Sequence, residues 1–188
     1  ERSAAGRFAT PGLDTCSGGC ADGVSYRGFT NVTGSDLDET PIGDDDANVI
    51  DARDGVDVVN AKGGDDDVRG DDGDKVYNLG DGEDKLLQQS LDDGHTVAFG
   101  GAGDDRLSVV ADTSEIHGGA GDDFILALEP GGLEAPGVNF IFGDDGDDFI
   151  EFDSVRRVDG GDGNDTVRFA GAGGVTVDLA TQRFSNEP

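Results

Sequence analysis

Two stretches of nine residues decide the fold: Gly100-Gly101-Ala102-Gly103-Asp104-Asp105-Arg106-Leu107-Ser108 and Gly118-Gly119-Ala120-Gly121-Asp122-Asp123-Phe124-Ile125-Leu126. Each has glycine at its first and fourth positions, Asp at the sixth and an apolar residue at the eighth. Residues 143–151 and 160–168 have the same order. A pattern that returns with a fixed period predicts a repeat architecture, in which each unit buries its apolar face against its neighbours.

Three rows of residues keep this nine-residue step along most of the chain. The apolar row, which we predict to be the core, is Ile50, Val59, Val68, Tyr77, Leu86, Ala98, Leu107, Ile116, Ile125, Ile141, Ile150, Val158, Val167 and Val177. The row two residues earlier is mostly acidic: Asn48, Asp57, Asp66, Lys75, Asp84, Asp105, Ser114, Asp123, Asn139, Asp148 and Asp165. The third row, four residues before the apolar one, is mostly glycine. A solvated acidic surface would explain the charge but not three rows that share one phase.

The composition does not supply a conventional core. The 188 residues include 42 Asp and Glu against 13 Lys and Arg, for a formal net charge of −29, and 34% of them are hydrophobic. Such a chain repels itself and buries too little apolar surface to offset its ordering entropy. Its acidic residues are 34 Asp and 8 Glu, a bias that favours turns over solvated helices. We therefore expect a multivalent cation to supply folding free energy, and the sign of the charge excludes nucleic acid as a partner.

The nonapeptide Gly-Gly-x-Gly-x-Asp-x-apolar-x resembles the RTX (repeats-in-toxin) family of secreted calcium-binding proteins, over about residues 34–177. The resemblance implies an all-β fold, a right-handed parallel β-roll (a β-solenoid) in which two nonapeptides make one coil. The residues agree with it. Three residues around the apolar position can form a short strand, and the other six must reverse the chain with glycines at positive φ. No stretch satisfies the rival calcium motif, the EF-hand.

Calcium sites are expected between stacked turns. Calcium takes about six to eight oxygen ligands, and one turn offers about half of them, so two turns must share an ion. In the resembled family the ligands are the carbonyls of the first four turn positions and the carboxylate of the sixth. The clearest implied site joins Gly100, Gly101, Ala102, Gly103 and Asp105 to Gly118, Gly119, Ala120, Gly121 and Asp123. A second joins Gly143, Asp144, Asp145, Gly146 and Asp148 to Gly160, Gly161, Asp162, Gly163 and Asp165.

The earlier units depart from the motif. Further candidate ligands are Asp57, Gly64, Asp66, Gly82 and Asp84. Lys75 replaces the ligand Asp of its unit, so we expect Asp74 to reach the ion in its place. Ser114 carries no carboxylate, which puts calcium binding at its edge in doubt. Several calcium ions are therefore expected, but fewer ions than repeats.

The repeat divides the chain into three segments. Residues 1–33 form a lead-in or linker, residues 34–177 form the repeats with an irregular insertion at about 129–137, and residues 178–188 form a trailing linker. Cys16 and Cys20 are expected to form a disulfide, typical of an oxidising extracellular setting; zinc is disfavoured because further ligands are distant. No apolar stretch is long enough for a membrane span. The sequence begins without Met, and we expect a mature segment or an excerpt.

We expect no catalysis, because the sequence has neither His-Glu-x-x-His nor Gly-x-Ser-x-Gly and its aspartates are committed to calcium. Three hypotheses about function remain. The first is a structural module of a secreted or cell-surface bacterial protein that folds on binding extracellular calcium at millimolar concentration. The second is a self-assembling subunit of a calcium-dependent fibre, surface layer or adhesin, with homo-oligomer or filament neighbours as partners. The third is a non-catalytic module of a secreted hydrolase or polysaccharide-modifying enzyme.

Overall fold

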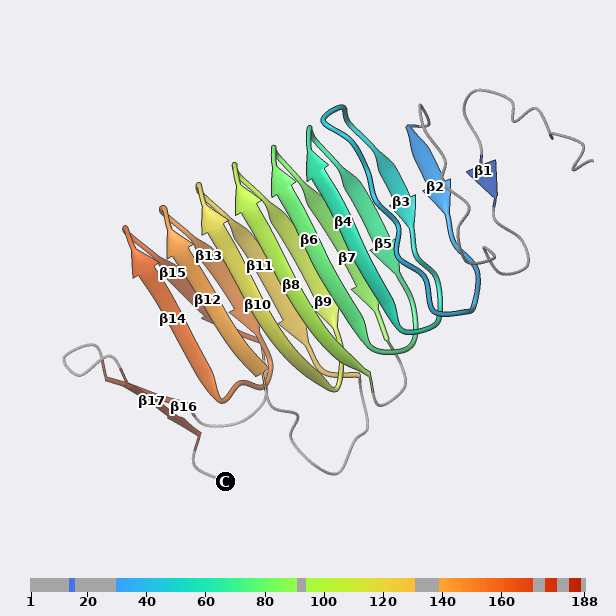
Figure 1. The fold of residues 1–188 in the computed structure, drawn as a ribbon. Helices are drawn as coiled ribbons and strands as arrows, with labels where there is room; N and C mark the ends of the chain where they lie inside the picture. Colours follow the sequence, from blue (N-terminus) through green and yellow to red (C-terminus); the bar gives the residue numbers. More distant parts are fainter. Residues whose placement is uncertain are drawn as a thin grey trace, which may run out of the picture.

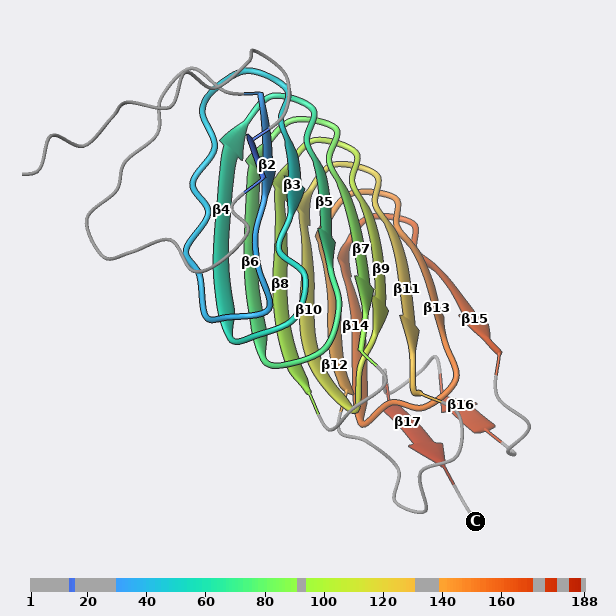
Figure 2. The same cartoon turned by 90° about the vertical axis from the view of Figure 1, so that its right-hand side faces the viewer.

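The computed structural model describes residues 14–15, 30–90, 94–130, 139–170, 175–178 and 183–186. Within them the regular elements are β-strands, and most of these run parallel in two sheets that face each other. The chain coils through the two sheets alternately, which gives a long flattened solenoid (Figures 1 and 2). The predicted all-β parallel β-roll is therefore confirmed.

We name the two sheets A and B. Sheet A contains β1 (Asp14–Thr15), β2 (Asn31–Thr33), β3 (Val49–Asp51), β5 (Asp67–Gly70), β7 (Lys85–Gln89), β9 (Arg106–Val110), β11 (Phe124–Leu128), β13 (Phe149–Phe152) and β15 (Thr166–Phe169). Sheet B contains β4 (Asp57–Gly63), β6 (Lys75–Asp81), β8 (His95–Ala102), β10 (Thr113–Ala120), β12 (Asn139–Asp145) and β14 (Arg157–Asp162). A separate antiparallel pair is formed by β16 (Val175–Asp178) and β17 (Arg183–Asn186).

The two edges of the solenoid differ. The turns that lead from a sheet B strand to the next sheet A strand stack along one side, which we call the aspartate edge. The turns that lead from sheet A back to sheet B stack along the other side, the second edge. Each coil therefore contributes one nonapeptide turn to each edge, as expected from two nonapeptides per coil.

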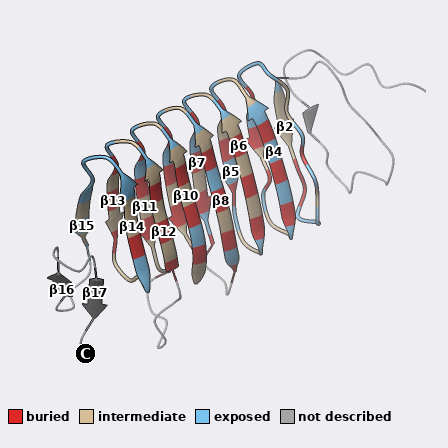
Figure 3. Cartoon of the chain, turned by 60° about the vertical axis from the view of Figure 1, so that its left-hand side comes forward, coloured by how far each residue is buried: buried red, intermediate tan, exposed pale blue. Residues whose placement is uncertain are grey.

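The predicted apolar row forms the core. From Ile50 to Ile150 its members are buried with at most 1% of their surface exposed, while Val158 is 6% exposed and Val167 is partly buried. Val177 lies where side chains are not described. The rows of adjacent coils are in register, for example Leu107 opposite Ile125 and Ile125 opposite Ile150. From β3 to β13, buried residues alternate along each strand with intermediate or exposed ones (Figure 3), as a strand with one face in the core requires.

The strands of the two sheets are unequal in length, which sequence reasoning did not predict. Sheet A strands β2 to β15 have 3–5 residues, close to the expected three, but sheet B strands have 6–8. Sheet B strands continue through the first three positions of the glycine-rich turn, where Gly101 pairs with Gly119 and Ala102 with Ala120. At the aspartate edge only three residues, such as 103–105, separate the two strands.

The remaining expectations concern membrane spans, the two cysteines and the bounds of the three segments. The described residues form no helix long and apolar enough to cross a membrane. Cys16 and Cys20 lie outside the described residues, as does most of the insertion expected at 129–137. The division into a lead-in, a repeat region and a trailing segment stays a prediction.

Candidate metal centre

A ladder of hydrogen bonds links the sixth turn positions along the aspartate edge. Asn48, Asp66, Asp84, Asp105, Asp123 and Asp148 are all buried there. The backbone N–H of each donates to Oδ1 of the Asp one coil further on, over 2.7, 2.8, 2.8, 2.8, 2.9 and 3.2 Å in chain order, and the last acceptor is Asp165. Each carboxylate thereby fastens its own coil to the preceding one.

The ladder is continuous, whereas the sequence suggested separate pairs. Asp105 and Asp123 meet as predicted, and so do Asp66 and Asp84. Asp84 also meets Asp105 across 21 residues, and Asp123 meets Asp148 across 25. Asp148 meets Asp165 although only 17 residues separate them. The units at 100–105, 118–123, 143–148 and 160–165 therefore form one uninterrupted row.

The second carboxylate oxygen of these residues has no partner. Oδ2 of Asp66, Asp84, Asp105, Asp123 and Asp148 is buried and accepts no hydrogen bond. A buried acceptor without a partner costs about 1–3 kcal/mol, and more if it is charged. A cation bound beside these carboxylates would offset that cost. No group of three or more His, Cys, Asp or Glu side chains that could hold a metal gathers among the described residues. Any ion here must therefore take backbone carbonyls as well.

Such carbonyls lie close to the first glycine of three well-preserved units. A Cβ added to Gly100 would overlap both Asp105 Oδ2 and the carbonyl of Gly118 in the next coil. Additions at Gly118 and Gly143 would overlap the equivalent pairs, Asp123 Oδ2 with the Gly143 carbonyl and Asp148 Oδ2 with the Gly160 carbonyl. Only a residue without a side chain leaves this space open. Carboxylate and carbonyl oxygens are the ligands that calcium prefers, so the residues present fit that ion.

Glycines at the second and fourth positions serve a different purpose. Gly101, Gly103, Gly119 and Gly121 have φ of 123°, 126°, 120° and 134°, a region that residues with a Cβ rarely adopt. The third-position carbonyls, of Ala102, Ala120, Asp145 and Asp162, each accept a hydrogen bond from the fourth-position N–H of the preceding coil. These positions shape and stack the turn, while the sixth position leaves a buried carboxylate oxygen unpaired.

Burial perturbs the ladder carboxylates. Loss of solvent raises the pKa of Asp105 and Asp123 to about 7, and neighbouring carboxylates of the stack add to the effect. The same causes raise the pKa of Asp66 to about 6 and raise the pKa of Asp84 and of Asp148. The hydrogen bond that each accepts acts in the opposite direction. The ion-free roll therefore binds protons more tightly than the unfolded chain, where Asp has a pKa of about 3.9.

We expect acid to favour the ion-free fold. A raised pKa in the folded state adds stability below the unfolded value of about 3.9, and this stability is lost as the pH rises through about 7. In a chelator, far-UV circular dichroism should show more β-structure at pH 5 than at pH 8. A control at matched ionic strength separates protonation from screening. A β-signal that declines from pH 8 to pH 5 would contradict the prediction.

The earlier units keep the ladder but not the open space. Asp66 and Asp84 have buried, unpaired Oδ2 atoms, and Gly64 and Gly82 have the positive φ of the fourth position. Their first positions are Ala61 and Leu79, both fully buried in the core. These two units therefore meet one requirement for calcium, the carboxylate, and lack the bare first glycine.

Two predicted ligands lie on the second edge, and their surroundings differ from those that the sequence suggested. Asp57 is buried, but its Oδ2 lies 3.1 Å from the ammonium of Lys75. Asp74 does not reach inward in place of Lys75; it is exposed, and its Oδ1 accepts the backbone N–H of His95. The reason is that Lys75 itself fills the sixth position. The other buried residues at that position are the uncharged Thr96, Ser114 and Asn139, in keeping with the doubt about this edge.

A second ladder was missed by sequence reasoning. Exposed fifth-position aspartates accept N–H groups from the fifth position of the following coil: Asp65 from Glu83, Asp104 from Asp122, Asp122 from Asp147 and Asp147 from Asn164, over 2.8–3.0 Å. The acidic pairs at positions five and six were a visible signal. The two members of a pair bond in opposite directions, so each coil is held from both sides.

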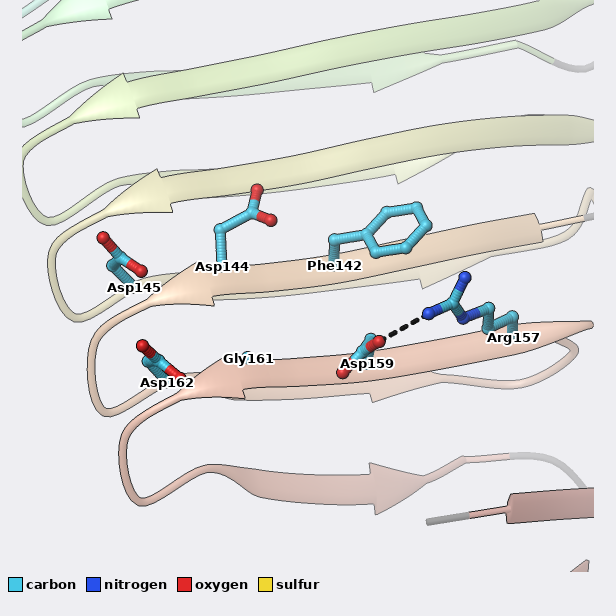
Figure 4. A pocket seen from close by; sticks show the side chains of 7 residues that line it. All are labelled: Phe142, Asp144, Asp145, Arg157, Asp159, Gly161 and Asp162. Atoms are coloured by element: carbon cyan, nitrogen blue, oxygen red, sulfur yellow. Dashed lines mark hydrogen bonds and ion pairs between the residues drawn. The ribbon is translucent and has the colours of Figure 1, made fainter.

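Acidic side chains of the second implied site also reach the outer face of sheet B. A surface hollow there is lined by Phe142, Asp144, Asp145, Arg157, Asp159, Gly161 and Asp162 (Figure 4). Arg157 pairs with Asp159 at 2.6 Å. Since Asp145 and Asp162 are exposed, only their backbone carbonyls belong to the predicted site.

Comparison with known proteins agrees with this geometry. A search of the curated proteins finds no match. The family model described as the RTX calcium-binding nonapeptide repeat (4 copies) matches residues 33–68, 42–76, 92–108, 99–128, 136–154 and 157–173, which is more than half of the chain. The matched ranges contain every residue of the aspartate ladder from Asn48 to Asp165 except Asp84. Repeat, fold and oxygen-lined edge together show that this chain belongs to the RTX calcium-binding nonapeptide repeat family.

Proposed function

We propose that this chain is a calcium-dependent structural module of a secreted or cell-surface protein, and that calcium at the aspartate edge is what makes its coils fold. The observation that carries the proposal is the row of five buried carboxylates whose Oδ2 atoms lack a partner. Without a cation, these groups oppose folding at neutral pH. When bound, calcium supplies the positive charge that the row lacks.

The ladder explains how binding would become folding. Oδ1 of Asp105 accepts the N–H of Asp84 from the preceding coil, and its Oδ2 lies with the Gly118 carbonyl of the next coil. One side chain thus engages three successive coils. Because these oxygens come together only in the folded solenoid, the binding free energy is folding free energy.

The module is proposed to have no catalytic role. The ladder carboxylates are buried and hydrogen-bonded to the backbone, so a substrate could not reach them.

The alternative of a module of a polysaccharide-modifying enzyme is not favoured by the exposed face of sheet B. There Phe99, His117 and Phe142 stack on one another with ring centroids 5.2 and 4.5 Å apart, and Arg157 covers Phe142. Both faces of the His117 and Phe142 rings are occupied, whereas sugar stacking would need one free.

We expect calcium alone to convert the chain from coil to β-structure. The test is far-UV circular dichroism of the full chain at pH 7.5, titrated from chelator into calcium, with a midpoint in the millimolar range. Magnesium is the control, because it demands a small octahedral shell and keeps its water. A chain already folded in chelator, or one that folds equally well in magnesium, contradicts the proposal. Sedimentation velocity on the same samples distinguishes a monomeric module from a filament subunit, because the size of a filament would increase with protein concentration.

A further inference from the structure

A lysine is buried on the second edge, where the aspartate edge has carboxylates. Lys75 stands at the sixth position of the turn at 70–75 and has no exposed side-chain surface. Full burial of a lysine is rare unless the ammonium is paired. Its position in the repeat is the one at which the RTX motif carries a ligand.

The ammonium of Lys75 lies among three oxygens from two successive coils. It donates hydrogen bonds to the carbonyls of Gly55 and, over 2.7 Å, of Asp72. It also lies 3.1 Å from Oδ2 of Asp57, a carboxylate that is itself fully buried. Gly55 and Asp57 belong to the turn of one coil and Asp72 to the turn of the next. One carboxylate and two carbonyls match the three N–H donors of an ammonium, and they are also the oxygen types that calcium takes.

We propose that the ammonium of Lys75 occupies a latent calcium site on the second edge, so that the coils of β4 and β6 are joined there by a covalently attached cation instead of a metal. The inference rests on the proposed function of the aspartate edge, because it assigns the same task to a different cation. The latent site consists of Asp57 with the carbonyls of Gly55 and Asp72.

The rest of the second edge supports this assignment. Its other buried sixth-position residues are the neutral Thr96, Ser114 and Asn139. Ser114 donates to Asn139, and Asn139 donates to the Ser154 carbonyl, so the side chains of these two residues are paired without a cation. Among the described residues of this edge, Asp57 is the one buried carboxylate at a sixth position, and Lys75 is set against it. A cation is thus provided where the edge carries a buried negative charge.

The test is the number of calcium ions that the full chain binds, measured by equilibrium dialysis at pH 7.5 for the natural chain, Lys75→Asp and Lys75→Met. Lys75→Asp removes the ammonium and adds the missing carboxylate, so it should bind one more calcium ion than the natural chain. Lys75→Met removes the charge but supplies no ligand, so it should gain no ion. Its thermal midpoint in saturating calcium should fall below that of Lys75→Asp.

The outcomes separate this inference from the proposed function. If Lys75→Asp binds the same number of ions as the natural chain, or fails to fold in saturating calcium, the latent site is refuted. It is also refuted if Lys75→Met gains an ion equally. If the natural chain binds no calcium but Lys75→Asp binds one ion, the proposed function fails and the latent site stands.

Discussion

Asp123→Asn should reverse the order of stability between chelator and calcium. The amide oxygen can still accept the N–H of Asp105, which now lies 2.8 Å from Oδ1. The amide nitrogen replaces the unpaired Oδ2 and can donate to the nearby Gly143 carbonyl. In chelator the variant should be more stable than the natural chain by about 1–3 kcal/mol, the cost of a buried unpaired acceptor.

In calcium the same substitution should be harmful, because a donor now stands where the ion needs an oxygen. We expect the calcium midpoint of folding to rise at least about tenfold, equivalent to about 1.4 kcal/mol. Asp122→Asn is the matched control: the charge change is the same, but Asp122 is exposed and its Oδ1 only accepts the N–H of Asp147. Urea unfolding at fixed calcium measures both. Equal shifts for the two variants would show that net charge, and not the ladder, controls calcium binding.

Gly100→Ala should weaken calcium-dependent folding although alanine suits the backbone there. Gly100 does not have a positive φ, so the cost comes only from the methyl group, which would overlap Asp105 Oδ2 and the Gly118 carbonyl. Overpacking of this kind costs about 1–3 kcal/mol, and the methyl group also fills the space in which the two oxygens converge.

Gly63→Ala provides the control for this glycine. A Cβ at Gly63 would lie 3.5 Å from the Asp81 carbonyl, an ordinary contact, and its φ is not positive. We expect its stability in calcium to change by less than about 0.5 kcal/mol. Isothermal calorimetry should show weaker calcium binding for Gly100→Ala alone. If the two glycine variants behave alike, the first position has no special part in calcium binding.

The rows of the repeat predicted the core and two links of the ladder, Asp66 with Asp84 and Asp105 with Asp123, because equivalent residues of alternate units must stack. Once two units make a coil, residues 18 apart must stack, and Asp105 with Asp123 did so. The contacts of Asp84 with Asp105 and of Asp123 with Asp148 were not foreseen, since insertions changed the spacing to 21 and 25. Both insertions lie between a sheet A strand and the next sheet B strand, so the aspartate edge stays in register.

Two further features depend on contacts that a residue type does not encode. The first and second glycines of a unit are indistinguishable by residue type, yet Gly118 is needed for space and Gly119 for its φ of 120°. Lys75 was visible as a lost ligand. The sequence alone did not show that the coil is deep enough to bury the apolar part of this side chain while its ammonium contacts Asp57. Sequence therefore placed the row of aspartates on one edge but did not predict the ion pair of Lys75 with Asp57 on the other.

The unequal freedom of the two edges has a consequence for how such chains diversify. The turn from the first to the sixth position keeps one length on the aspartate edge, while the connections on the second edge take up every change of length. New residues can therefore be added between β7 and β8 or between β11 and β12 without disturbing the ladder. Because successive coils are about 4.8 Å apart, insertion points on the second edge are evenly spaced. Peptides grafted there would be displayed in line, at intervals set by the backbone.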